Sequence, residues 1–315
     1  MSGKKGNFPT QFLDVVGKPL RESVLLRDYS NFRIGGKADY FFAATSLPEL
    51  VSSIRLAREL SLPFFIIGGG YNLLFDDHGF RGLIIKNTVK KIKRKGDKGK
   101  IEALAGTPLK DVLQFSTEEG LSGFEFLSGI PGTVGGAVYG NAGAFDQSIG
   151  DFLSGAVILD EEGGKKNIKK DYFGFGYRHS SLKGGKDVLL SAVFELHPGE
   201  KEKIKSRIEE ILETRKEKHP PEGVAYPGSY FKNPVLPDGK KVPAAFFLDK
   251  VGAKNLRMGG AFVYSGHANF IINQGGASAR DVLSLARELK RRVREQFGVE
   301  LEEEVIFLPA NPSAP

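Results

Sequence analysis

The chain has 315 residues, 40% of them hydrophobic and 26% charged, which is typical of a globular protein with about two domains. It contains no cysteine, which excludes thiol nucleophiles, iron–sulfur clusters, cysteine zinc sites and disulfides. The five histidines include no H-E-x-x-H pair, so no metal site is predicted. The net charge of +7 suits nucleic acid, an anionic membrane or a phosphorylated small molecule as partner.

The N-terminus is polar from Met1 to Gln11 and shows no secretory signal. No apolar run approaches the roughly 18 residues that span a bilayer. We therefore expect a cytoplasmic protein with no membrane partner.

The first half of the chain alternates helix and strand signals. A capping box at Ser46 and Glu49 predicts the start of a helix. Apolar runs at 64–67 and 83–85 predict buried strands. Thr107 followed by Pro108 predicts a helix with the threonine as N-cap and the proline as its first residue.

The second half begins with a predicted strand at 188–196, and the composition changes near residue 200. Residues 200–218 are highly charged and carry an isoleucine stripe at helical spacing. A capping box at Ser278 predicts a helix that Gly298 ends. Residues 299–308 are predicted to form a closing strand. We place a domain boundary at about residue 200.

The densest basic run is Lys90–Lys100, interrupted by Asp97. It contains no aromatic residue that could stack on a base, and it flanks a turn signal at Gly96. A solvated β-hairpin is the favoured interpretation, and a nucleic-acid-binding module is the alternative.

Two glycine-rich segments dominate the sequence, Gly68–Leu74 and Gly129–Gly143, the second with six glycines in fifteen residues. Without Cβ atoms, backbone N–H groups can approach an anion, and two segments suit a pyrophosphate held from both sides. A pair of tight turns packed together is the alternative. The segments fit neither the P-loop nor the Rossmann pattern, and the G-x-S-x-G pattern is absent.

Seven motifs resemble, in order, those of the UDP-N-acetylenolpyruvoylglucosamine reductase (MurB) family. Together they are specific, and the resemblance extends over roughly residues 25–308. They are Asn31–Asp39, Gly68–Leu74, Gly129–Ala144, Tyr177–Ser180, Gly228–Pro234, Gly266–Phe270 and Leu301–Val305.

The resemblance implies an α+β protein with a two-lobed FAD-binding domain of the vanillyl-alcohol oxidase (PCMH) type and a C-terminal substrate-binding domain. With the boundary above, the division is an N-terminal extension, FAD-binding domain, C-terminal domain and tail (residues 1–21, 22–200, 201–308 and 309–315). The implied reaction reduces UDP-N-acetylenolpyruvoylglucosamine to UDP-N-acetylmuramate, with NADPH as reductant and FAD as carrier. It is a step of peptidoglycan precursor synthesis.

The resemblance also implies which residues hold FAD. They are Arg33, Gly35, Gly68, Gly69, Gly70, Tyr71, Asn72, Leu73, Gly129, Pro131, Gly132, Gly135, Gly136, Asn141, Gly143 and Ala144. Tyr71 departs from the family, which usually has serine there, so backbone groups must do more of the pyrophosphate binding. The first segment contains no histidine or cysteine, so we expect non-covalent FAD.

By the same resemblance, Arg178 clamps the substrate carboxylate, Ser229 donates the proton and Glu304 completes the catalytic set. Read alone, Arg178 could be a surface arginine and Ser229 a turn serine. Strand periodicity does not choose among Glu302, Glu303 and Glu304; only the motif selects Glu304.

Lys232, Asn233 and His267 are expected to bind substrate, with a structural role for His267 as the alternative. Arg178 and Ser229 are 51 residues apart, which resembles the shorter family subtype without a tyrosine loop. Another flavoprotein oxidoreductase on the same fold is the alternative enzyme. No nucleic-acid partner is expected.

Overall fold

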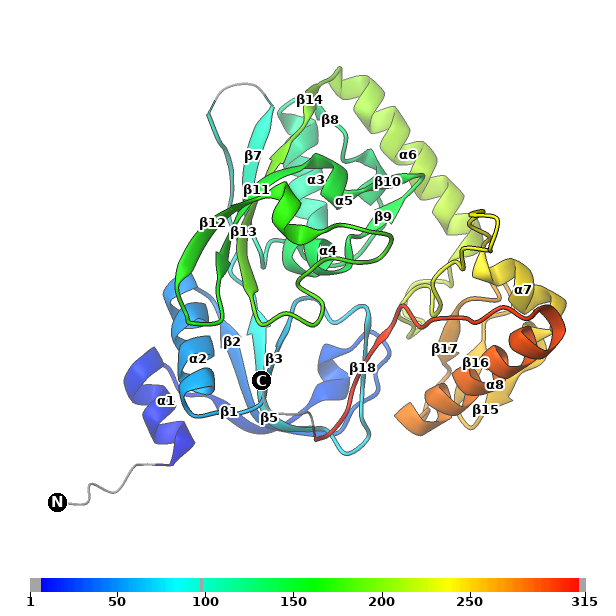
Figure 1. The fold of residues 1–315 in the computed structure, drawn as a ribbon, viewed down its shortest axis with the longest axis horizontal. Coiled ribbons are helices and arrows are strands. Elements are labelled where there is room, and N and C mark those ends of the chain that lie inside the picture. Colours follow the sequence, from blue (N-terminus) through cyan, green and yellow to red (C-terminus); the bar gives the residue numbers. More distant parts are fainter. Residues whose placement is uncertain (1–6, 97–98, 312–315) are drawn as a thin grey trace.

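The computed structural model describes residues 7–96 and 99–311. Three short segments lie outside the described residues: residues 1–6 of the predicted N-terminal extension, residues 97–98 of the predicted turn and residues 312–315 of the predicted tail. Within the described residues, the chain forms two sheet-based lobes and a C-terminal α+β body (Figure 1).

The first lobe is a four-stranded sheet in the order β1-β2-β5-β3, in which β2 and β3 run parallel to β5. The run Leu83-Ile84-Ile85 in β5 is fully buried, as expected for a central parallel strand. Ser46 caps α2 through the backbone N–H of Glu49, which confirms the predicted helix start. The elements are α1 (Phe8–Val16), β1 (Arg21–Leu25), η1 (Leu26–Tyr29), β2 (Lys37–Ala44), α2 (Leu47–Glu59), β3 (Phe64–Ile67) and β5 (Phe80–Asn87).

The second lobe is an antiparallel sheet in the order β12-β11-β13-β7-β6. Its helices pack on a core that includes the edge-to-face rings of Phe124 and Phe194, 5.1 Å apart. The main elements are β6 (Ile92–Arg94), β7 (Lys100–Leu104), α3 (Leu109–Glu118), α4 (Val134–Gly140), α5 (Ile149–Phe152), β11 (Leu153–Leu159), β12 (Lys165–Lys169) and β13 (Val188–Glu195). Short elements complete it: β8 (Leu121–Ser122), η2 (Glu125–Leu127), β9 (Gly143–Ala144), β10 (Gln147–Ser148), η3 (Lys170–Phe173) and β14 (His197–Pro198).

The basic run forms the predicted β-hairpin. Strands β6 and β7 pair antiparallel, and the Lys95 N–H donates to the carbonyl of Lys100 at 2.9 Å. Its cations are partly neutralised, since Lys93 lies 3.1 Å from Glu102 and Arg94 forms an ion pair with Glu119.

The charged helix α6 (Lys201–Lys218) is present as predicted and ends before Pro220. It packs against α3 and η2 of the second lobe, with Ile204 and Ile211 buried. In Figure 1 it runs from the top of that lobe down to the C-terminal body. The domain boundary at about residue 200 stays a prediction.

The C-terminal body packs two helices on a three-stranded antiparallel sheet, β15-β16-β17. The Ser278 capping box and the left-handed Gly298 (φ 66°) bound α8, as predicted. Asp77 of the first lobe accepts hydrogen bonds from the N–H groups of Ala279 and Arg280, which joins this body to the lobe. The elements are α7 (Ala244–Lys250), η4 (Ala253–Asn255), β15 (Arg257–Met258), β16 (Ala261–Val263), β17 (Ile271–Asn273) and α8 (Ala279–Phe297).

Two predictions about elements were wrong in their bounds. Helix α3 begins at Leu109 with Pro108 as N-cap, because the Thr107 hydroxyl instead bonds the backbone of Lys91. Of the predicted closing strand 299–308, only β18 (Ile306–Leu308) is strand, paired with β4 (Leu73–Phe75).

The segment before β18 is irregular because it crosses from the C-terminal body back to the first lobe (Figure 1). There its backbone bonds the chain around Tyr230: the Lys232 N–H donates to Glu302 and the Glu304 N–H donates to Tyr230. At the start of the predicted tail, the Ala310 carbonyl accepts a hydrogen bond from the Arg81 N–H at 2.7 Å. This crossing places Glu304 at the junction of the lobes and the C-terminal body.

Membrane-spanning helices were sought over residues 7–96 and 99–311. None of those helices combines the length and the apolar character that crossing a bilayer needs.

Candidate active site

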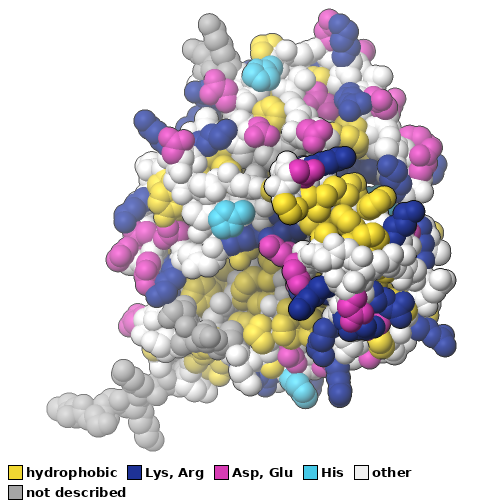
Figure 2. Space-filling model, turned by 45° about the vertical axis from the view of Figure 1, so that its right-hand side comes forward, with side chains coloured by type: hydrophobic (Ala, Val, Ile, Leu, Met, Phe, Trp, Pro, Cys, Tyr) yellow, Lys and Arg dark blue, Asp and Glu magenta, His cyan; other side chains and the backbone are white. Residues whose placement is uncertain are grey.

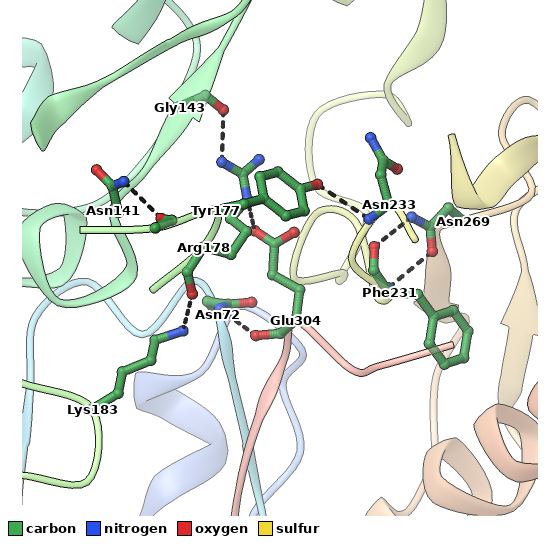
Figure 3. Close-up of polar contacts among 11 residues, drawn as sticks. Asn72, Asn141, Gly143, Tyr177, Arg178, Lys183, Phe231, Asn233, Asn269 and Glu304 are labelled. Carbon is green, nitrogen blue, oxygen red and sulfur yellow. Dashed lines mark hydrogen bonds and ion pairs between the residues drawn. The ribbon is translucent and has the colours of Figure 1, made fainter. Parts of the chain in front are cut away.

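An ion pair between Arg178 and Glu304 lies at the junction of the three parts (Figure 3). The Arg178 Nε is 2.6 Å from Glu304 Oε1, yet its N–H is not aligned for a hydrogen bond, so the contact is electrostatic. The Arg178 Nη1 donates to the carbonyl of Gly143 at 2.9 Å. Both side chains are about one-fifth exposed, so the pair can still be reached from solvent.

A tight turn presents Arg178. The backbones of Gly176 and His179 bond each other in both directions at 3.1 Å, with Tyr177 and Arg178 between them. Arg178 has φ +53°, in the left-handed region that non-glycine residues rarely adopt. Such strain, on the order of 1–3 kcal/mol, concentrates at functional sites.

Ser229 is placed beside Glu304 by its chain neighbour. The carbonyl of Tyr230 accepts a hydrogen bond from the Glu304 N–H at 2.7 Å. Among the described residues, the Ser229 hydroxyl makes no hydrogen bond to Arg178 or Glu304. The structure thus brings the three predicted catalytic residues to one junction, with Arg178 and Glu304 in direct contact.

The three adjacent glutamates have different partners. Glu302 pairs with Lys232 at 2.8 Å and Glu303 with Lys290 at 3.0 Å, whereas Glu304 pairs with Arg178. The geometry therefore supports Glu304 where periodicity could not choose.

The two glycine segments touch each other. A Cβ on Gly68 would lie 2.4 Å from the Thr133 Oγ1. The two segments are therefore packed against each other, which the alternative of two packed turns predicts and which a pyrophosphate site between them also requires. Gly70 (φ +74°) is packed against residues outside both segments, because a Cβ there would lie 1.9 Å from the Tyr29 carbonyl oxygen.

The predicted FAD-binding glycines differ in how closely the protein packs on them. A Cβ on Gly132 or Gly136 would meet its nearest neighbour at 4.0 or 3.8 Å, an ordinary van der Waals contact, so packing within the protein does not require glycine at these two positions. Others are required by the protein's own packing: a Cβ on Gly35 would lie 2.7 Å from Phe75, and one on Gly143 2.3 Å from Gln147.

The remaining predicted FAD contacts are mixed. The ring of Tyr71 is partly exposed and lies over Gly69, where a Cβ would be 2.4 Å from it. Leu73 is a buried strand residue of β4, so only its backbone could face a ligand. A Cβ on Gly135 would lie 3.0 Å from the Ala105 carbonyl oxygen. Exposed or half-buried positions with no such constraint are Arg33, Pro131 and Ala144.

Two buried guanidinium nitrogens lack hydrogen-bond partners among the described residues, the Nε atoms of Arg178 and Arg215. Arg215 packs against Gly129, and burial lowers its pKa, with Tyr226 and Arg178 acting in opposite directions. Buried N–H donors without a hydrogen-bond acceptor favour a ligand that brings acceptor oxygens to them. Figure 2 shows a hollow with a hydrophobic floor and charged side chains at its rim. These features fit a flavin with an anionic tail.

The predicted substrate residues are distributed around the pair. The backbone N–H of Asn233 donates a hydrogen bond to the Tyr177 hydroxyl oxygen at 3.1 Å, so Asn233 lies beside the Arg178 turn. Lys232 is held by Glu302. His267 stacks on Phe270 with ring centroids 4.1 Å apart, and burial lowers its pKa.

Two family models and several known reductases match the chain. A family model described as "UDP-N-acetylenolpyruvoylglucosamine reductase, C-terminal domain" matches residues 221–308, and one described as "FAD binding domain" matches 38–166. The chain is 38% identical over 299 residues to the UDP-N-acetylenolpyruvoylglucosamine reductase of Geotalea uraniireducens, covering 94% of this chain and 96% of that protein. A relative of the same name from Clostridium botulinum (strain Hall) is 39% identical over 306 residues, covering 95% and 96%.

The chain belongs to the UDP-N-acetylenolpyruvoylglucosamine reductase family. A crystal structure of the MurB reductase from Thermus caldophilus superposes with a TM-score of 0.73 at 34% identity, covering 92% of this chain and all of that one. The family resemblance and the two-lobed FAD-binding fold with a C-terminal domain are thereby confirmed.

Some residues of this reductase's site were missed from sequence. Tyr177 lies inside a quoted motif, yet its contacts to Arg178 and Asn233 were not foreseen. Lys183 donates to the Arg178 carbonyl at 2.8 Å, and Arg215 and Asn269 also line the junction. Asn269 lies inside a quoted motif and Lys183 lies three residues after one, whereas Arg215 lies in the charged helix and gave no such signal.

His219 gives the reductase a pH-dependent stability. Burial first, then Arg215 and His267, lower its pKa from 6.5 to about 4. Between these two pH values His219 is protonated in the unfolded chain but neutral in the folded chain. The free energy of unfolding should therefore fall as the pH drops from 6.5 to about 4. His219→Gln, which can still bond Tyr226, should reduce this loss by about 1 kcal/mol, since water screens the half-buried ring. Denaturant melts of both proteins across that window measure it; equal acid losses would contradict the assignment.

Proposed function

We propose that this protein reduces UDP-N-acetylenolpyruvoylglucosamine to UDP-N-acetylmuramate with NADPH, through non-covalently bound FAD. The observation that carries the proposal is the Arg178–Glu304 pair: Arg178 bonds the second glycine segment at Gly143, and the Glu304 N–H bonds Tyr230, the residue after Ser229. A cytoplasmic location, where peptidoglycan precursors are assembled, belongs to the same proposal.

The two glycine segments would hold FAD, and their backbone N–H groups would bind its pyrophosphate. The chemistry that bound FAD would supply is hydride transfer from NADPH to the enolpyruvyl double bond. Tyr71 cannot place a hydroxyl where the usual serine would, because its ring lies over Gly69. Backbone donors therefore carry the binding at that point.

Arg178 acts where charge develops. Hydride addition at the terminal carbon of the double bond moves the π electron pair toward the substrate carboxylate. A guanidinium beside that carboxylate binds more strongly as the charge grows, which lowers the barrier. The ion pair with Glu304 and the bond to Gly143 hold the guanidinium in one orientation.

Ser229 completes the reduction. Its hydroxyl donates a proton to the other carbon of the former double bond, and the serine oxygen recovers a proton from solvent. Lys232, Asn233 and His267 would bind the rest of the UDP-sugar. With α6 filling the interval between Arg178 and Ser229, we assign the chain to the shorter subtype without a tyrosine loop.

A test of the function begins with the purified protein. It should be yellow, and heat or acid precipitation should leave the flavin in the supernatant. NADPH oxidation under anaerobic conditions should then depend on added UDP-N-acetylenolpyruvoylglucosamine. Flavin that stays on the denatured chain would refute non-covalent binding. If the rate of NADPH oxidation does not depend on the UDP-sugar, the alternative that the protein is another flavoprotein oxidoreductase would be favoured.

The hairpin of β6 and β7 is expected to take no part in catalysis, because its cations already face Glu102 and Glu119. Replacing Lys93, Arg94 and Lys95 together by glutamine should leave kcat and KM nearly unchanged. Steady-state kinetics check this. A large rise in the KM for the UDP-sugar would instead show that the hairpin contacts or steers the diphosphate.

A further inference from the structure

Asn72 of the first glycine segment binds the backbone of Glu304. Its side-chain Nδ2 donates to the backbone carbonyl of Glu304 at 2.9 Å (Figure 3). The backbone carbonyl of Asn72 accepts a hydrogen bond from the Ile306 N–H at 3.1 Å. The Glu304 N–H is held from the other side by Tyr230. The peptide groups on both sides of the Glu304 Cα are therefore fixed, and one of them by an asparagine amide.

Asn141 of the second glycine segment makes the same kind of contact near Arg178. It is 6% exposed, and its Nδ2 donates to the Gly176 carbonyl at 2.8 Å while its Oδ1 accepts from the Gly150 N–H at 3.0 Å. Gly176 opens the tight turn that presents Arg178. Both ends of this amide are thus used within the protein.

Asn269 clamps the chain that carries Ser229. It is 3% exposed; its Oδ1 accepts from the Phe231 N–H and its Nδ2 donates to the Phe231 carbonyl, both at 2.9 Å. Its backbone carbonyl also accepts from the Tyr230 N–H at 2.8 Å. Figure 3 shows this two-point contact beside the Arg178–Glu304 pair.

We propose that Asn72, Asn141 and Asn269 are positioning residues, each of which holds the backbone next to one catalytic residue: Glu304, Arg178 and Ser229 respectively. The inference rests on the proposed function and deepens it. It also differs from the sequence analysis, in which Asn72 and Asn141 were expected to contact FAD. The hydrogen bonds of their side-chain amides go to the protein backbone.

The physical reason is geometric. Arg178 and Glu304 come from different parts of the chain, and each lies in irregular backbone that no sheet or helix fixes. A neutral amide can donate and accept at once, and it binds carbonyl and N–H groups without adding a charge to the ion pair. Small displacements of reacting groups can cost about 10²-fold in rate.

Asn72→Asp and Asn72→Ala test the proposal, since Asn72 is only half-buried and the aspartate is isosteric but lacks the N–H donor. Flavin reduction by NADPH and the Kd for FAD should change little. Reoxidation of the reduced flavin by saturating UDP-sugar should slow by about 10- to 100-fold, with little change in the UDP-sugar concentration that gives the half-maximal rate. Anaerobic stopped-flow spectrophotometry and FAD titration of the apoprotein give these quantities.

Asn273→Asp is the matched control. The Nδ2 of Asn273 donates to the Phe32 carbonyl at 2.9 Å and so joins the C-terminal body to the first lobe, but it holds no catalytic residue. This variant should keep both half-reactions near the wild-type rates.

Three results would overturn the proposal. A raised Kd for FAD with normal reoxidation at saturating FAD would make Asn72 a cofactor ligand. Unchanged reoxidation, or equal slowing of both half-reactions, would remove the positioning role. A wild-type protein whose reduced flavin is not reoxidised by the UDP-sugar would instead refute the proposed function itself.

Discussion

Arg178→Ala should lower kcat by about 10²- to 10³-fold, the typical effect of removing one group that stabilises a developing anion. FAD should stay bound, because the hydrogen bond of Arg178 to the second glycine segment goes to the Gly143 carbonyl and so uses none of the backbone N–H groups proposed to hold the cofactor. Arg178→Lys should also be impaired, since a lysine cannot contact Glu304 and Gly143 at once with a planar fork. The flavin-to-protein ratio and steady-state turnover of each variant measure these effects.

Glu304→Gln is the partner experiment. It keeps the size of the side chain but removes the charge that lies 2.6 Å from the Arg178 Nε. Turnover should fall while flavin is retained, and the double variant should lose less than the product of the two single losses, because the two residues act as one unit. Either single variant purifying without flavin would show that the pair serves cofactor binding instead.

Ser229→Ala should separate the two halves of the reaction. Reduction of the flavin by NADPH should be nearly intact, because no proton from Ser229 is needed there. Reoxidation by the UDP-sugar should slow by about 10²- to 10⁴-fold, the usual contribution of a positioned general acid. Stopped-flow measurement of flavin absorbance records each half separately.

Two results of the Ser229→Ala experiment would contradict the proposed role of Ser229. Equal slowing of both halves would indicate that the Gly228–Tyr230 chain had shifted, and with it the backbone bond from Tyr230 to Glu304. Unchanged reoxidation would remove Ser229 from the mechanism.

Local sequence signals predicted the ends of helices well where a single residue determines the backbone conformation at that end. Ser278 caps α8 and Gly298 ends it, because a hydroxyl that bonds a free N–H and a glycine in the left-handed region are local effects. Thr107 misled for the opposite reason: its hydroxyl could bond a helix N–H or the distant backbone of Lys91, and the tertiary contact prevailed.

The site itself needed the family motifs. Strand periodicity could not distinguish Glu304 from Glu302, since both were expected on one face of a strand. The irregular crossing from the C-terminal body to β4 gives them different partners. The density of glycine drew attention to the two glycine-rich segments, but it did not predict which groups their asparagine side chains bind. Asn72 and Asn141 bind backbone that is distant in sequence, and such contacts leave no periodic signal.

The most direct test of the account is a single turnover. The enzyme is reduced with one equivalent of NADPH without oxygen and mixed with UDP-N-acetylenolpyruvoylglucosamine. We expect the flavin colour to return as the UDP-sugar gains two hydrogen atoms by mass spectrometry, giving UDP-N-acetylmuramate. A flavin that stays bleached with the UDP-sugar, yet regains its colour when oxygen is admitted, would contradict the proposed function.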